Sequence, residues 1–191
     1  MTEPLFENFK SKIDLSESDY YRFLEFTQTK KLSKDEFLLK AGSQSKFLAY
    51  VVNGALANYT IDERGDRHVL VIAPHDHWTT DLNGFFSEAP STYFIEALTD
   101  CEAILISHEN FEKACQEIPK LDRFFRLLFQ KAFTAALNRL TEMQSESAEE
   151  RYLKLIQSQQ QLFDNLPQHY IASYLGIKPQ SLSRLRKKLG F

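Results

Sequence analysis

The residues best suited to contact phosphate groups are gathered near the C-terminal end of the sequence. From Asn165 to Phe191 there is no aspartate or glutamate, whereas Lys178, Arg184, Arg186, Lys187 and Lys188 are basic. All 26 acidic residues lie before this segment, and the whole chain has a net charge of only −3. Attraction to a phosphate backbone depends on local rather than total charge. The segment therefore suits nucleic-acid binding, although a solvated basic helix would show the same charge.

The spacing of small and apolar residues in this segment predicts two helices joined by a tight turn. Ala172 is small where the helices would cross, Gly176 can take the left-handed conformation that ends the first helix, and Pro179 suits the start of the second. The apolar positions of the expected small core are Ile171, Leu175, Ile177, Leu182 and Leu185. These features predict a helix-turn-helix, and a helical hairpin without a partner is the competing interpretation.

The second helix of this motif carries the residues expected to contact DNA. They are Lys178, Gln180, Ser181, Arg184, Arg186, Lys187 and Lys188. Gln180, Ser181 and Arg184 lie toward its outward-facing N-terminal side, from which they can reach base edges in the major groove. We expect the four remaining basic residues to contact backbone phosphates, which orient a protein without reading sequence. A merely solvated face is the alternative for those four.

A second group of residues could hold a metal. His75 and His77 are two positions apart, on one face if they lie in a strand, and Asp81 follows. This spacing resembles the first metal motif of cupin enzymes, but His108 follows the last expected strand and lies in the wrong place for the second motif. A cupin-like metal-dependent enzyme is thus an alternative, against exposed loop histidines. Since no nucleophile motif or glycine-rich phosphate loop occurs, we expect no catalytic residue, no metal and no enzyme.

The elements that would position these residues begin with two short helices over Phe6–Thr29, where Ser16 offers an N-cap. Short strands follow, expected at 37–39, 47–52, 56–61, 68–72, 93–98 and 103–106. Asp62–Asp66 is expected to form a hairpin tip at which Gly65 takes a positive φ. Short strands this close together favour an antiparallel β-roll or jelly roll.

A long helix is expected after Pro119, which suits a first-turn position. Alternating steps of four and three relate Leu121, Phe125, Leu128, Ala132, Ala135 and Arg139. Such a seam is typical of a coiled coil and predicts a homodimer. The flanking residues Phe124, Leu127, Phe129, Phe133, Leu137 and Leu140 are expected to pack on the sheet domain. A single amphipathic core helix is the alternative.

The fold class expected from these patterns is α+β, in three parts. Residues 1–116 would form an antiparallel β-roll sensor domain, residues 117–144 the dimerisation helix and hinge, and residues 145–191 the helix-turn-helix domain. Ser147 and Glu150 have the spacing of a capping box at the start of the last part.

The two cysteines, Cys101 and Cys115, have no metal-binding or redox spacing and are expected to be free thiols in a reducing compartment. No apolar run is long enough for a membrane helix, and Met1–Lys10 does not have the pattern of a signal peptide. We therefore expect a cytoplasmic protein.

The whole chain resembles the Crp/Fnr family of bacterial regulators, which combine a cyclic-nucleotide-binding-like roll, a dimer helix and a C-terminal helix-turn-helix. Asn53-Gly54-Ala55 resembles the family's turn between early strands, and the stretch Ala97–Glu102 resembles its approach to the last strand. Ser181–Lys188 resembles the recognition helices of a subgroup associated with Bacteroidetes-type bacteria. The resemblance implies a transcription regulator that binds a palindromic duplex as a homodimer.

The chain also departs from the family pattern in its sensor. Members that bind cyclic AMP use a Gly-Glu pair for the ribose and an arginine for the cyclic phosphate, where this chain has Thr80-Asp81 and Ser91-Thr92. Arginine suits bidentate phosphate binding, so Asp81, Ser91 and Thr92 are ligand-pocket candidates in a sensor that we expect not to respond to cyclic AMP. Lys46 or Arg67 could supply another cation.

Further departures concern cofactor and recognition helix. No N-terminal cysteine cluster for an iron–sulfur centre occurs, so we expect no cofactor. Pro179 and Gln180 stand where the family commonly has arginine and glutamate, which implies a different sequence preference. Because the chain stops at Phe191, the winged hairpin of many relatives is expected to be short or absent. An unknown small-molecule effector stays open, as does a dimeric adaptor that binds no DNA.

Overall fold

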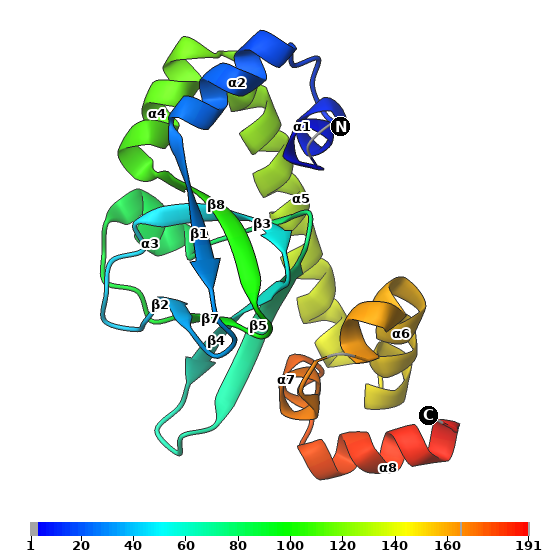
Figure 1. Ribbon diagram of the computed structural model, residues 1–191. Coiled ribbons are helices and arrows are strands. Elements are labelled where there is room, and N and C mark those ends of the chain that lie inside the picture. Colours follow the sequence, from blue (N-terminus) through cyan, green and yellow to red (C-terminus); the bar gives the residue numbers. More distant parts are fainter. Residues whose placement is uncertain (1–3, 165, 191) are drawn as a thin grey trace.

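The computed structural model describes residues 4–164 and 166–190, and it begins with two short helices (Figure 1). They are α1 (Pro4–Lys10) and α2 (Glu17–Glu25). The Oγ atom of Ser16 accepts a hydrogen bond from the backbone N–H of Asp19 at 3.1 Å, which caps α2. Both helices and the cap confirm the sequence prediction.

Two four-stranded antiparallel sheets form the body of the molecule. One has the order β1-β8-β3-β6 and the other the order β2-β7-β4-β5. The strands are β1 (Thr27–Leu32), β2 (Phe37–Leu39), β3 (Phe47–Asn53), β4 (Ala55–Ile61), β5 (Arg67–Pro74), β6 (His77–Thr79), β7 (Phe94–Ala97) and β8 (Cys101–Ser107). Since successive strands such as β3 and β4 belong to different sheets, the chain winds into the expected roll.

Two glycines allow the sharp changes of direction in this roll. Gly54, between β3 and β4, has a φ of +84°, and a Cβ atom there would lie 2.4 Å from the carbonyl oxygen of Asp100. Gly65, at the tip of the β4–β5 hairpin, has a φ of +83° and open space around it. Its positive φ confirms the predicted hairpin tip.

Three further helices cover the roll on one side: α3 (Leu82–Ser87), α4 (His108–Glu117) and the long α5 (Lys120–Ser145). The largest apolar cluster joins α1, α2 and α4 to the first turns of α5. Within it the rings of Phe9 and Phe124 are 4.4 Å apart between centroids, and both side chains are fully buried. Burial of these apolar side chains fixes the start of α5 on the β-roll.

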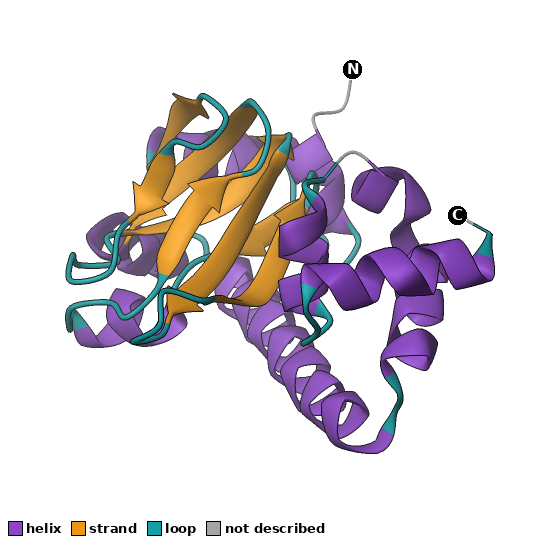
Figure 2. Ribbon diagram, turned by 90° about the horizontal axis from the view of Figure 1, so that it is seen from below, coloured by secondary structure: helices purple, strands orange, loops and turns teal. Residues whose placement is uncertain are grey.

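The C-terminal part consists of α6 (Ala148–Asp164), α7 (Gln168–Tyr174) and α8 (Pro179–Leu189). Ser147 and Glu150 form the predicted capping box before α6, with the Glu150 N–H donating to Ser147 Oγ at 3.2 Å and the Ser147 N–H to Glu150 Oε2 at 2.7 Å. Figure 2 shows these helices beside the strands, with α5 linking the two parts. A second apolar cluster joins the outer face of the β2-β7-β4-β5 sheet to α6, α7 and α8.

The prediction for the faces of the long helix was wrong in part: Phe124 is buried against the domain as expected, but other residues of both faces are not. Leu121 and Phe125, expected in the dimer seam, are buried in their own domain. Phe133, Leu137 and Leu140, expected to pack on the sheet, are exposed. The reason is that only the first turns of α5 lie on the domain core, and the later turns extend beyond it (Figure 1).

Candidate nucleic-acid interface

Helices α7 and α8 form the predicted helix-turn-helix, and the turn between them is closed by backbone hydrogen bonds. The N–H of Ile177 donates to the carbonyl of Ala172 at 2.9 Å, and the N–H of Gly176 donates to that of Ser173 at 3.0 Å. This pair of bonds is a Schellman motif, in which Gly176 takes the left-handed conformation with a φ of +70°. The sequence prediction for Gly176 is thus confirmed.

The small core of the motif also follows the prediction. Ile171, Ala172, Leu175 and Leu182 are buried, whereas Ile177 and Leu185 are half-buried. Pro179 is the first residue of α8, where its missing N–H removes no helical hydrogen bond. Because Leu182, Leu185 and Leu189 face the inside, the polar side of α8 must face outward.

The structure leaves six of the seven predicted DNA-contact residues exposed. Lys178, Gln180, Ser181, Arg184, Lys187 and Lys188 are exposed, and Arg186 is half-buried. Gln180, Arg184 and Lys187 recur at helical spacing, so they share one stripe. Lys188 Nζ contacts Glu149 Oε2 of α6 at 2.6 Å, so this lysine is paired within the protein.

The three ligand-pocket candidates differ in burial and in hydrogen bonding. Asp81 precedes α3 and is buried, yet its carboxylate caps no helix N–H. Ser91 is buried and serves its own loop, since its Oγ accepts the N–H of Tyr93 at 2.9 Å. Thr92 is exposed. Sequence reasoning missed Asn58, which lies inside the roll, accepts from Thr79 Oγ1 at 2.9 Å and donates to the carbonyl of Thr80 at 3.1 Å.

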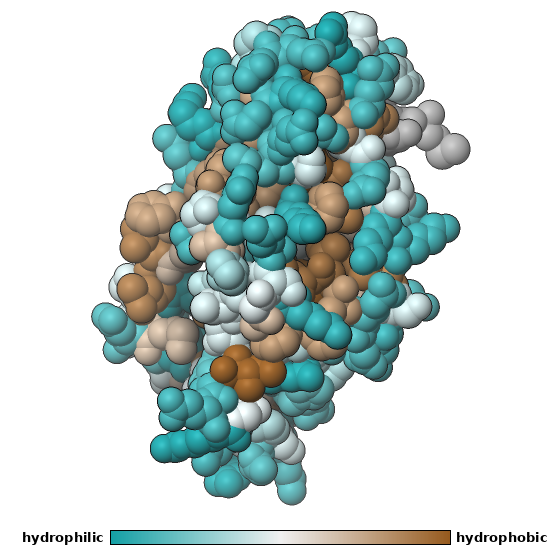
Figure 3. All heavy atoms as spheres, turned by 90° about the vertical axis from the view of Figure 1, so that its left-hand side faces the viewer, coloured by the Kyte–Doolittle hydropathy of each residue, from teal (hydrophilic) through white to brown (hydrophobic). Residues whose placement is uncertain are grey.

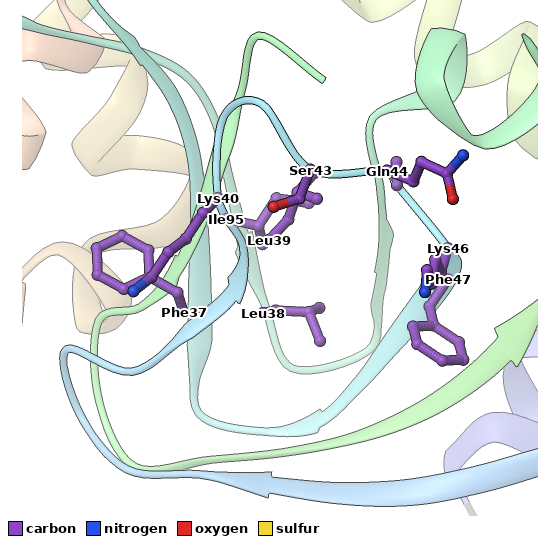
Figure 4. A pocket seen from close by; sticks show the side chains of 10 residues that line it. Phe37, Leu38, Leu39, Lys40, Ser43, Gln44, Lys46, Phe47 and Ile95 are labelled. Atoms are coloured by element: carbon purple, nitrogen blue, oxygen red, sulfur yellow. The ribbon is translucent and has the colours of Figure 1, made fainter. Parts of the chain in front are cut away.

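The β-roll carries an open groove of about 480 Å³ between β2, the following turn and the start of β3 (Figure 4). Its lining is Phe37, Leu38, Leu39, Lys40, Ser43, Gln44, Ser45, Lys46, Phe47 and Ile95. None of the three ligand-pocket candidates belongs to it. Of the two alternative cations, Lys46 lines the groove, while Arg67 contacts Glu96 elsewhere. On the face shown in Figure 3, apolar side chains reach the surface between hydrophilic ends.

The residues of the metal alternative are not brought together. His75 lies in the turn after β5 rather than on a strand, and the Nδ1 atom of His77 is 3.0 Å from the carbonyl oxygen of His75. His108 opens α4, at 3.6 Å from Glu112. In residues 4–157 and 166–190, whose side chains the structure describes, no three side chains of histidine, cysteine, aspartate or glutamate gather as metal ligands would. The same residues include no helix with the length and hydrophobicity to cross a membrane.

The predicted position of Arg139 in α5 was also wrong. It was expected in the dimer seam, but its guanidinium donates to the carbonyl of Val69 at 2.9 Å and to that of Tyr174 at 2.7 Å. It also lies 4.0 Å from the centre of the Tyr174 ring. Burial lowers the pKa of this guanidinium, although an arginine stays protonated at neutral pH. Arg139 therefore connects α5, β5 and α7.

Known proteins resemble this chain in sequence over most of its length. Residues 29–118 match the family model of the cyclic nucleotide-binding domain. The fumarate and nitrate reduction regulatory protein of Vibrio cholerae is 25% identical over 187 aligned residues, covering 90% of this chain and 72% of the relative. The protein of that name from Escherichia coli K12 is 25% identical over 169 residues, covering 82% of this chain and 66% of the relative.

Solved structures share the fold at lower identity. FixK2 from Bradyrhizobium japonicum has a TM-score of 0.75 at 19% identity, with 86% of this chain and 84% of FixK2 covered. The c-di-GMP-responsive regulator CLP of Xanthomonas campestris has a TM-score of 0.74 at 16% identity and 92% coverage of both chains. A Crp/Fnr regulator from Eubacterium rectale has a TM-score of 0.72 at 14% identity, covering 93% of this chain and 84% of its own. The domain match, the relatives named fumarate and nitrate reduction regulatory protein, and the shared order of roll, long helix and C-terminal helices together support a transcription regulator of the Crp/Fnr type.

Proposed function

We propose that this protein is a homodimeric regulator that binds double-stranded DNA with α8 in the major groove. The observation that carries the proposal is the exposed basic side of α8, held outward by the buried leucines of its other side. A helix of this kind at the end of a helix-turn-helix matches the dimensions of the major groove.

Within α8 we propose two kinds of contact. Arg184 and Gln180 would donate to guanine and adenine edges, and Ser181 would reach a base edge or a phosphate. Lys178, Arg186, Lys187 and Lys188 would contact phosphates and set the orientation of the domain. Lys188 would exchange its contact with Glu149 for a phosphate, or share the two.

The proposed dimer uses the later turns of α5. Four large apolar side chains are exposed there: Phe133 at 66%, Leu137 at 48%, Leu140 at 56% and Met143 at 44%. A contiguous exposed stripe of this kind marks an interaction site. We propose that the same stripe of a second copy covers it, so that two copies of α8 read a palindrome with half-sites about 10 bp apart.

A charge placed in this stripe should separate the copies. We expect the Phe133→Glu variant to be a monomer at micromolar concentration by light scattering, because a carboxylate cannot be buried unpaired. Its affinity for a palindromic duplex should fall at least tenfold, since paired half-sites no longer bind one particle. Asn138→Glu adds the same charge on the opposite, exposed side of α5 and should stay dimeric. A monomeric wild type, or a dimeric Phe133→Glu variant, would contradict the proposal.

For the sensor, we propose that cyclic AMP is not the effector. Cyclic phosphates are bound best by an arginine, and Ser91 and Thr92 offer only hydroxyls. Asp81 would add a negative charge in the same region. A different small molecule, of unknown identity, is compatible with the groove of the roll.

Cyclic AMP and cyclic GMP at millimolar concentration should therefore raise the melting temperature no more than matched sodium phosphate does. The reason is that a ligand raises the free energy of unfolding only if it binds the folded protein. Calorimetry that shows saturable binding in the micromolar range would overturn this expectation. It would also make Lys46 the first candidate for the cation that replaces the missing arginine.

We further propose that the protein acts in the cytoplasm, is not an enzyme and divides functionally into residues 1–116, 117–144 and 145–191. Support for a reducing compartment comes from Cys101 and Cys115, which are both free and buried. Burial raises the pKa of the Cys101 thiol to about 11, so this thiol stays protonated and inert. The subgroup suggested by Ser181–Lys188 remains a prediction.

A further inference from the structure

A buried carboxylate connects the sensor sheet to the helix-turn-helix. Glu96 lies on β7 with only 4% of its surface exposed. Its Oε2 atom accepts hydrogen bonds from the hydroxyl of Tyr59 on β4 at 2.5 Å and from the hydroxyl of Tyr170 on α7 at 2.8 Å. One donor thus comes from the sensor and the other from the DNA-binding part. We call Tyr59, Arg67, Glu96 and Tyr170 the Glu96 anchor.

Arg67 of β5 completes the anchor. Its Nη1 atom is 3.2 Å from Glu96 Oε2 and also donates to the hydroxyl of Tyr170. The guanidinium lies 4.9 Å from the centre of the Tyr59 ring and 5.3 Å from that of the Tyr170 ring. Burial, and then the bond to Glu96, raise the pKa of both tyrosines, so both hydroxyls keep the protons that they donate.

Further bonds hold α7 on the edge strand β5. Ser173 Oγ accepts the N–H of Val69 at 2.9 Å and donates to the carbonyl of Arg67 at 2.5 Å. Arg139 ties the carbonyl groups of Val69 and Tyr174 to the dimer helix α5. Around these bonds, Ala57 and Val69 of the sheet share one apolar cluster with Ile171 and Ala172 of α7.

This interface leaves the recognition helix free. The hydrogen bonds from the helix-turn-helix to the sheet come from Tyr170 and Ser173 of α7. Gln180, Ser181 and Arg184 of α8 remain exposed. Apolar surfaces alone tolerate several relative orientations, but directional bonds inside them favour one. The contact is therefore suited to position α8 rather than to cover it.

We propose that the Glu96 anchor, with Ser173, fixes the helix-turn-helix on the sensor sheet and thereby sets the relative placement of the two recognition helices in a dimer. This inference rests on the proposed function. A dimer that binds two half-sites at once must hold both of its helix-turn-helix parts in fixed positions. If these positions are fixed before binding, ordering them does not reduce the affinity for DNA. Binding to one half-site does not require the two parts to be aligned with each other. These five residues are then positioning residues for paired sites, although none of them touches DNA.

The test compares Tyr170→Phe and Ser173→Ala with wild type on two duplexes, one with paired half-sites and one with a single half-site. We expect each variant to lose about tenfold in affinity for the paired site and less than twofold for the single site. Each substitution removes only a hydroxyl group, so we expect both variants to fold. Tyr21→Phe removes a hydroxyl from a side chain that is 63% exposed and serves as the control.

A second measurement needs no DNA. Hydrogen exchange at the Val69 amide, which donates to Ser173 Oγ, should quicken in Tyr170→Phe and stay unchanged in Tyr21→Phe. Equal losses on both duplexes, no loss on either, or tighter binding to the paired site would each overturn the proposal. If wild type binds neither duplex while Val69 exchange still responds, the proposed DNA-binding function fails and the docking by the anchor stands alone.

Discussion

Replacing Arg184 by alanine should weaken binding to the preferred duplex by about 1–3 kcal/mol while leaving binding to unrelated duplexes nearly unchanged. Arg184 is exposed on the outward side of α8, on the stripe that starts at Gln180 near the N-terminal end of the helix. From there its guanidinium can donate two hydrogen bonds to a guanine edge, and the alanine variant loses both. The measurement is a fluorescence titration of both duplexes at several salt concentrations.

Two further variants separate reading from simple charge loss. Lys187→Ala should weaken both duplexes similarly and lower the salt slope by about one unit per subunit, because it removes a phosphate contact. Arg123→Ala removes a positive charge from an exposed position on α5 and should change neither duplex. If Arg184→Ala weakens specific and unrelated duplexes equally, Arg184 contacts only phosphate, and the assignment of the reading face is wrong.

Gly54→Ala should destabilise the sensor domain by about 3 kcal/mol or more in urea unfolding. Two effects add at this position. A residue with a side chain is strained by about 1–2 kcal/mol at a φ of +84°. The new Cβ atom would also stand 2.4 Å from the carbonyl oxygen of Asp100 and 2.9 Å from the Cα atom of Cys101, both backbone atoms where the turn before β8 meets that strand.

Gly65→Ala is the matched control for this substitution. Gly65 has nearly the same φ, +83°, but no atom lies within 4 Å of the position of its Cβ. It should lose only the conformational part, about 1–2 kcal/mol. Equal losses for the two variants would show that the contact with the turn before β8 does not matter.

The helix-turn-helix could be predicted because its determinants are local. Ala172, Gly176 and Pro179 each act within a few positions of the chain, and the structure uses each as expected. The β4–β5 hairpin, with Gly65 at its tip, is local in the same sense. Where the meaning of a residue depends only on its neighbours, one sequence is enough to read it.

Strands β1 and β6 could not be predicted in that way. Strand β1 is mostly polar because it lies at a sheet edge, with only Leu32 buried, and it pairs with β8 some seventy residues later. The His77–Thr79 strand is short and follows a turn in which Asp76 has a φ of +61°. No pattern of alternating hydrophobicity marks either one.

The faces of α5 and the role of Glu96 needed three-dimensional information. Apolar residues of α5 point to all sides of the helix, so their spacing alone did not tell which of them the sensor domain covers. A glutamate between Ile95 and Ala97 suggests a solvent-facing position, yet its partner Tyr170 is 74 residues away. The His75–His77 pair, which suggested a metal site only as an alternative, falls on a turn and a short strand.

Selection of bound sequences from a random duplex pool tests the central claim most directly. The purified wild-type protein would be incubated with the pool at several salt concentrations, and the retained duplexes sequenced. We predict a palindrome with half-sites about 10 bp apart, retained less as salt increases, because two copies of α8 read two half-sites and release counterions. Absence of salt-dependent retention of any duplex would contradict the DNA-binding function, and a single unrepeated site would contradict the dimer.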